Sequence, residues 1–119
     1  MKFFDKDFAT QFANEWISNW NNHDLDSILS HYTEDVTFHS PMIQKILGES
    51  TDKVVGKDSL SIYWAKGLKL IPDLHFELIN IFSGAHCLSI YYRGHRGLVI
   101  ETFFFNSSGK VYQACACYE

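Results

Sequence analysis

The chain has 119 residues, 46% of them hydrophobic and 20% charged, which is the composition of a soluble globular protein and predicts a single domain over residues 1–119. Its formal net charge of −4 argues against nucleic acid as a partner, because binding phosphates requires a basic surface. The charged N-terminus lacks the apolar run of a signal peptide, and no stretch reaches the roughly 20 apolar residues of a membrane span, so we expect a cytoplasmic protein with no membrane partner.

The N-terminal part of the chain predicts two helices. Apolar residues recur at helical spacing from Phe4 to Trp20 and predict a long amphipathic helix, which residues 21–23 end. Asp24 then precedes a short apolar segment, residues 25–29, and its side chain can cap a second helix there.

A strand and a third helix are predicted before Pro72. Residues 36–40 form the strand, which Pro41 ends, while residues 42–55 contain several turn-forming residues and are predicted as a loop. The third helix follows, because five residues share one helical face: Leu60, Tyr63, Trp64, Gly67 and Leu68.

Four strands are predicted after Pro72, where the apolar period changes from that of a helix to that of a strand. The runs rich in β-forming residues are 74–82, 86–93, 98–106 and 110–118. The turns between them are short, which indicates an antiparallel meander. Helices first and strands last predict an α+β fold, with three N-terminal helices packed on one face of a curved sheet.

Glu101 is the first candidate for chemistry. Strand alternation places it on the same face as Val99, Phe103 and Phe105. If that face is buried, desolvation raises the pKa of the Glu101 carboxyl, which then stays protonated near neutrality and donates a hydrogen bond to a ligand oxygen. If the opposite face is the buried one, Glu101 is an ordinary exposed side chain. Alternation alone leaves both readings open.

The last strand offers a second indication of a ligand site. One of its faces carries two small residues between two phenols: Tyr112, Ala114, Ala116 and Tyr118. Small residues in mid-strand leave a gap, and a gap with hydroxyl groups beside it suits a ligand cavity. The alternative is that the first helix fills the gap with Trp16 or Phe12.

Several other residues suit either the core or a site. The aromatic ones are Trp16, Tyr32, Phe38 and Trp64. His39 points away from Ser40 by alternation, yet a strand end distorted by Pro41 would turn it inward, which makes His39 a candidate catalytic residue. Cys87, Cys115 and Cys117 are expected to be reduced thiols, and because no second close pair of Cys or His residues accompanies them, we expect no metal and no cofactor.

Three sequence stretches together resemble a known superfamily. They are WISNWNNHDLDSI at residues 16–28, YTEDVTFHSP at 32–41 and VGKD at 55–58. In order and spacing they resemble the nuclear transport factor 2-like (NTF2-like) superfamily, in particular its SnoaL-like and ketosteroid isomerase-like branches. The resemblance covers nearly the whole chain and implies a cone-shaped α+β barrel. In that fold a strongly curved, mostly antiparallel sheet wraps the first helix, a pocket lies at the open end, and dimers often form through the outer sheet face.

The resemblance also implies roles for individual residues. The oxyanion-hole acid of ketosteroid isomerase falls on Glu101, and its oxyanion-hole tyrosine falls on Trp16, whose indole can donate a hydrogen bond but cannot act as an acid. The general base falls on Ser40, which cannot serve as a base at neutral pH without help. Tyr32 and Trp64 fall where the family can have a tyrosine network. The implied pocket wall includes Ala114, Ala116 and Tyr118.

Two functional hypotheses follow. The first is a protein that binds a small, largely apolar carbonyl or hydroxyl compound, and that acts as an isomerase, cyclase, dehydratase or hydrolase if Glu101 or His39 supplies the base. Its expected pocket consists of Trp16, Tyr32, Phe38, Tyr63, Trp64, Phe103, Tyr112, Ala114, Ala116 and Tyr118. The second is a non-catalytic homodimeric carrier or protein-interaction module. Its expected interface is the outer sheet face with Ile100, Thr102, Phe104, Cys115 and Cys117.

Overall fold

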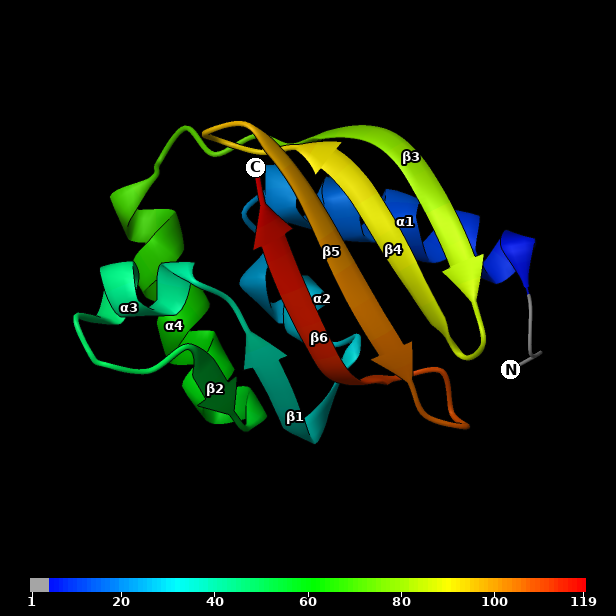
Figure 1. The fold of residues 1–119 in the computed structure, drawn as a ribbon, viewed down its shortest axis with the longest axis horizontal. Coiled ribbons are helices and arrows are strands. Elements are labelled where there is room, and N and C mark those ends of the chain that lie inside the picture. Colours follow the sequence, from blue (N-terminus) through cyan, green and yellow to red (C-terminus); the bar gives the residue numbers. More distant parts are fainter. Residues whose placement is uncertain (1–4) are drawn as a thin grey trace.

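Helix α1 (Lys6–Asn21) lies against the curved sheet in the computed structural model, which describes residues 5–119 (Figure 1). The helix begins at Asp5, whose side chain accepts a hydrogen bond from the Phe8 backbone N–H at 3.0 Å. The inward face of α1 carries the expected large rings, with Phe12, Trp16 and Trp20 all buried. Phe4, the first apolar position of the predicted helix, lies outside the described residues.

The sheet has six strands in the order β2-β1-β6-β5-β4-β3. Their bounds are β1 (Tyr32–His39), β2 (Lys53–Val55), β3 (Glu77–Gly84), β4 (Cys87–Arg93), β5 (Leu98–Phe105) and β6 (Val111–Tyr118). Strands β3 to β6 form the predicted antiparallel meander, whereas β1 pairs with β6 in parallel. The predicted α+β cone fold is thus confirmed, with a mixed sheet that stays open between β2 and β3.

The region between β1 and the third predicted helix corrects the sequence prediction. Residues 42–55 are not a loop: they contain helix α3 (Met42–Leu47), which ends at Gly48 with φ of 72°, and strand β2, which pairs with β1. The turn-forming residues 48–52 obscured two short regular segments, and burial of Ile43 holds α3 in place. Helices α2 (Leu25–Leu29) and α4 (Lys57–Leu70) form as predicted. Because α3 is additional, the described residues contain four helices rather than three.

Two local boundaries also have clear physical causes. Asp24 caps α2 as predicted, accepting from the Ser27 backbone N–H at 3.2 Å and from the Ser27 hydroxyl at 2.7 Å. Strand β1 begins at Tyr32, four residues earlier than predicted, because Tyr32 pairs with Val111 on β6. That pairing is long-range, so a polar segment such as residues 33–35 gives no local indication of it.

Strand β5 settles which of its faces is buried. Val99, Glu101, Phe103 and Phe105 are all buried, whereas Ile100 is 45% exposed on the opposite side. The reading of Glu101 as an exposed side chain is therefore wrong, and its carboxyl belongs to the interior.

A β-bulge in β6 overturns one further expectation. Phe105 pairs with Val111 and Phe104 with Gln113, so Tyr112 is an extra residue between two pairs. Val111 is fully buried in its place and Tyr112 is 45% exposed. Tyr112 therefore leaves the face that it was predicted to share with Ala114 and Ala116.

Among residues 5–119, none of the helices has both the length and the apolar character that crossing a bilayer requires.

Candidate functional site

An apolar cavity of about 150 Å³ lies among α1, α4, the β4–β5 turn and the ends of β5 and β6. Eight aromatic residues line it: Trp16, Trp20, Phe38, Tyr63, Trp64, Phe76, Tyr92 and Tyr118. Its polar groups include three phenol hydroxyls and the buried carboxyl of Glu101, and its lining also includes three ionisable side chains nearer the surface: His95, Arg96 and Glu119. A few polar groups in an apolar, concave site are typical of pockets for small organic ligands.

Glu101 is the central polar residue of this cavity. It lies in mid-strand and pairs with Ala116 on β6 and with Ile90 on β4. The Tyr92 hydroxyl donates a hydrogen bond to Glu101 Oε1 at 3.1 Å. Burial raises the pKa of Glu101 from 4.5 to about 8, although the bond from Tyr92 acts in the opposite direction. Glu101 is thus mostly a neutral carboxylic acid at pH 7 and can donate its proton in a hydrogen bond.

The phenols around Glu101 stay neutral as well. Burial raises the pKa of Tyr92 well above its ordinary value, and the nearby Glu101 adds to this effect. Burial also raises the pKa of Tyr118 to about 12, partly offset by a hydrogen bond with Ser40, and raises that of Tyr63 for the same reasons. Each of these phenols is a hydrogen-bond donor, and none is a base at neutral pH.

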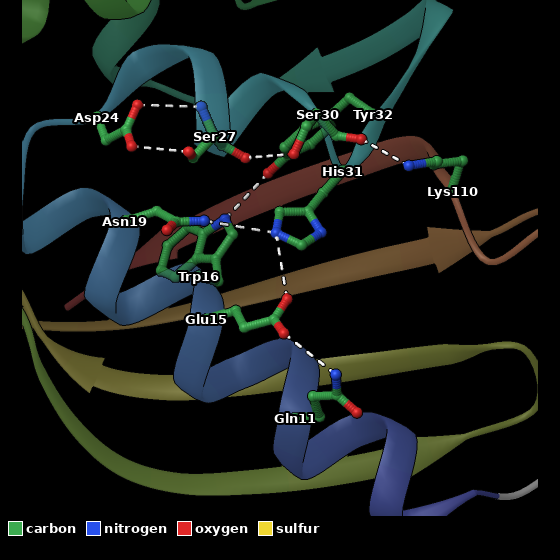
Figure 2. Close-up of polar contacts among 10 residues, drawn as sticks. All are labelled: Gln11, Glu15, Trp16, Asn19, Asp24, Ser27, Ser30, His31, Tyr32 and Lys110. Carbon is green, nitrogen blue, oxygen red and sulfur yellow. Dashed lines mark hydrogen bonds and ion pairs between the residues drawn. The ribbon is translucent and has the colours of Figure 1, made fainter.

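Trp16 uses its indole N–H inside the protein. Its Nε1 donates to the Tyr32 hydroxyl at 3.0 Å, as Figure 2 shows, and both side chains are buried. The Trp16 ring packs against Phe76 and Tyr92, with centroid distances of 5.7 and 5.4 Å. The Tyr32–Trp16 pair therefore fixes one wall of the cavity, and the Trp16 indole is not a free donor as an oxyanion hole would need.

The structure brings together six of the residues predicted for the site. Those that line the cavity are Trp16, Phe38, Tyr63, Trp64, Glu101 and Tyr118. Four others are buried but do not line it: Tyr32, Phe103, Ala114 and Ala116. Phe12 and Trp16 pack onto Phe103, which pairs with Ala114, at ring-centroid distances of 5.1 and 5.3 Å.

The two remaining catalytic candidates do not line the cavity, although Ser40 is hydrogen-bonded to the lining residue Tyr118. His39 is half-buried on β1, where it pairs with Lys53 and Cys115, and it is absent from the cavity lining. Ser40 is buried, and its Oγ accepts the Met42 backbone N–H at 3.1 Å, which helps to start α3. Tyr112 lies on the outer side of the bulge and is also outside the cavity lining.

Sequence reasoning missed Tyr92, Phe76 and Trp20 as site residues. Tyr92 could have been found, because Val99 opposite it and Glu101 lie on the same face, and diagonal neighbours on adjacent strands are close enough to interact. The sequence predicts Trp20 at the end of the first helix but does not indicate that it lines a cavity. The β4–β5 turn, which carries His95 and Arg96, also borders the cavity. No group of three His, Cys, Asp or Glu side chains within residues 5–119 is arranged to hold a metal ion.

Comparison of the sequence with models of known protein families shows which family the chain belongs to. The family model described as a SnoaL-like domain matches residues 13–119, which include all of the cavity lining. The chain belongs to the SnoaL-like domain family. Its cone fold is that of the NTF2-like superfamily, as the three sequence stretches implied. Comparison with curated proteins gives no match.

Solved structures agree with this assignment. A SnoaL-like protein of unknown function from Burkholderia thailandensis E264 is 44% identical, with a TM-score of 0.94 and 99% of each chain covered. AclR, a proposed hydroxylase from Streptomyces galilaeus, is 18% identical with a TM-score of 0.73, covering 97% of this chain and 91% of its own. A protein of unknown function with a cystatin-like fold from Methylobium petroleophilum PM1 is 11% identical with a TM-score of 0.75, over 98% and 79%. The last two share the fold of this SnoaL-like domain.

Proposed function

We propose that this SnoaL-like domain binds a small, largely apolar compound that carries a carbonyl or hydroxyl oxygen, and that the neutral Glu101 carboxyl donates a hydrogen bond to this oxygen. The observation that carries the proposal is the position of Glu101, a fully buried acid on the wall of an aromatic-lined cavity. An acid in such a place costs stability when it ionises, and a neutral acid there can polarise a ligand oxygen.

Acid–base chemistry on the bound compound depends on the same residue. A pKa of about 8 lies near neutral pH, where an acid both holds its proton and gives it up readily. The phenols of the cavity keep their protons at neutral pH and therefore cannot act as a base. The Ser40 hydroxyl accepts a hydrogen bond from the Met42 backbone N–H. We therefore propose ligand binding as the primary function, with Glu101 as the residue that would transfer a proton in an isomerase- or dehydratase-type reaction.

A matched set of ligands and variants tests this proposal. The probes are 2-naphthol, 1-tetralone and naphthalene, which share a two-ring apolar body and differ in the oxygen. We expect the two oxygen-bearing probes to raise the melting temperature of the wild type, since a ligand at a hundred times its dissociation constant adds about 2.7 kcal/mol. In Glu101→Leu, which has no hydrogen-bond donor at this position, the shift, measured against that variant without ligand, should be much smaller.

Glu15→Gln is the control for the loss of one carboxyl, because Glu15 lies on the exposed side of α1 and is absent from the cavity lining. Binding of 1-tetralone should also weaken above pH 8, where Glu101 loses its proton and can no longer donate. Equal shifts for all three probes, unchanged in Glu101→Leu, would contradict the proposal. Turnover of any bound compound is then measured separately.

A second candidate, a non-catalytic homodimeric carrier, is favoured by the outer sheet face. Ile100 and Phe82 are exposed there by 45% and 55%, and Cys117 is exposed beside Ile100 on β6. Exposed apolar side chains on one face often mark an association surface. We propose a homodimer through this face, which is compatible with a ligand in the cavity because the two lie on opposite sides of the sheet.

A further inference from the structure

Trp20 carries a buried donor that the protein leaves unused. Its indole Nε1 is buried and has no hydrogen-bond partner, and it is the one side-chain nitrogen or oxygen of residues 5–119 in that state. The whole residue is only 6% exposed. Buried polar groups in native proteins are nearly always hydrogen-bonded, so an exception needs an explanation.

The comparison with Trp16 shows that the fold can satisfy such a group. The two indoles lie one helical turn apart on α1, with ring centroids 6.0 Å apart. The Trp16 N–H has the Tyr32 hydroxyl as its acceptor at 3.0 Å (Figure 2). Around Trp20 the neighbouring side chains are aromatic rings instead: the centroid distance is 5.2 Å to Trp64 and 5.6 Å to Phe76. Neither of these two side chains carries an oxygen atom that could accept a hydrogen bond.

Trp20 is one of the residues that line the cavity, so a molecule bound there lies against its side chain. We propose that the Trp20 indole N–H is a second polar anchor of the ligand site and donates a hydrogen bond to an acceptor oxygen of the bound molecule. This inference rests on the proposed function and narrows its ligand class. The ligand has an apolar body with two oxygens, one held by Glu101 and the other, an acceptor such as a ketone, ester or ether oxygen, held by Trp20.

The two anchors line the same cavity and are linked through Phe76 and Tyr92. Trp20 and Tyr92 both pack on Phe76, at centroid distances of 5.6 and 4.6 Å, and Tyr92 is hydrogen-bonded to Glu101. The Glu101 carboxyl can both donate and accept, so it tolerates a hydroxyl or a carbonyl. The indole N–H only donates, so the Trp20 end requires an acceptor and discriminates against an alkyl group of the same shape.

The first test observes the Trp20 proton directly. The chain has three tryptophans, so a ¹⁵N-labelled sample gives three indole N–H resonances, which Trp→Phe variants assign. The probes are 6-acetyl-2-naphthol and 6-ethyl-2-naphthol, which share the phenol for Glu101 and differ in one carbonyl oxygen. We expect the acetyl compound to move the Trp20 indole proton downfield, as a new hydrogen bond does, and the ethyl compound to leave it nearly unchanged.

The second test measures affinity in variants. In the wild type the acetyl compound should bind about tenfold more tightly than the ethyl compound, the usual size of one added hydrogen bond. Trp20→Phe should reduce this ratio to about one, whereas Trp64→Phe, which removes an indole from the same cavity wall, should lower both affinities and keep the ratio. Glu101→Leu should weaken both compounds together, because both carry the phenol and the leucine side chain has no donor for it.

The outcomes separate the two levels of the proposal. If both compounds bind equally, Glu101→Leu weakens both and the Trp20 resonance stays in place, the proposed function stands and the role of Trp20 is refuted. The role of Trp20 is also refuted if its indole proton resonates upfield both with and without the acetyl compound, because the indole N–H then points at the face of the Trp64 ring. If neither compound binds at all, both the proposed function and this inference are overturned.

Discussion

Replacing Glu101 with glutamine should make the protein more stable, and more so at higher pH. The pKa of this carboxyl is about 8 in the folded protein and 4.5 without burial, so the folded state holds a proton that the unfolded chain releases. Between these two values, stability falls as pH rises, by about 1.4 kcal/mol for each pH unit. Below pH 4.5 both states are protonated and the penalty vanishes.

At pH 7 the accumulated penalty is about 3 kcal/mol, as an order of magnitude. Glutamine has nearly the same volume, never ionises, and its amide oxygen can still accept the hydrogen bond from Tyr92, which spans 3.1 Å in the wild type. Glu101→Gln should therefore unfold at higher urea concentration than the wild type at pH 7 and at nearly the same concentration at pH 4.5.

The assay is urea unfolding of both proteins at several pH values from 4.5 to 8, at one fixed protein concentration so that association does not shift the result. Glu49→Gln serves as the control, because Glu49 is exposed and lies outside the cavity lining. A stability difference between wild type and Glu101→Gln that stays constant across this pH range would refute the reasoning, since it would mean that Glu101 ionises alike in the folded and unfolded chains.

Three further predictions concern the neighbours of Glu101 and the outer face. Tyr92→Phe removes the hydrogen bond that lowers the pKa of Glu101, so the carboxyl ¹³C titration of Glu101 should move to higher pH, and an unchanged midpoint would contradict the bond. Tyr32→Phe leaves the buried Trp16 N–H without its acceptor and should cost about 1–3 kcal/mol in urea unfolding, whereas a neutral effect would show that another group satisfies this indole. Ile100→Lys should convert the proposed dimer to a monomer in sedimentation velocity, while Ile62→Lys, at an exposed position on α4, should not; a wild-type monomer at micromolar concentration would exclude the interface.

The sequence predicted elements best where local pattern and tertiary environment agree. The meander β3–β6 and the cap at Asp24 follow from alternation, short turns and a capping side chain, all of which act within a few residues. The segment 42–55 was mispredicted because its short helix and short strand are held by tertiary packing and by pairing with β1. Short elements of this kind have little local preference of their own.

The site shows the same division. Alternation placed Glu101 with Phe103 on one face, and the resemblance implied an inward acid, which the burial of Glu101 confirms. The pocket list was less accurate, because Tyr112 was assigned by strict alternation across a bulge that only the pairing of β5 with β6 reveals. Ala114 and Ala116 were taken for cavity wall, yet they are buried outside the cavity lining.

The sequence by itself determined the fold class, the order of the strands in the meander and the presence of one acid among apolar residues of β5. These properties depend on composition and on periods of two and 3.6 residues, which are written in consecutive positions. Only the tertiary structure decided that the cavity stays open beside Trp20, that Tyr32 takes the Trp16 donor, and that Tyr92 meets Glu101. These contacts join residues of different elements, and their geometry depends on how α1 and α4 lie across the curved sheet.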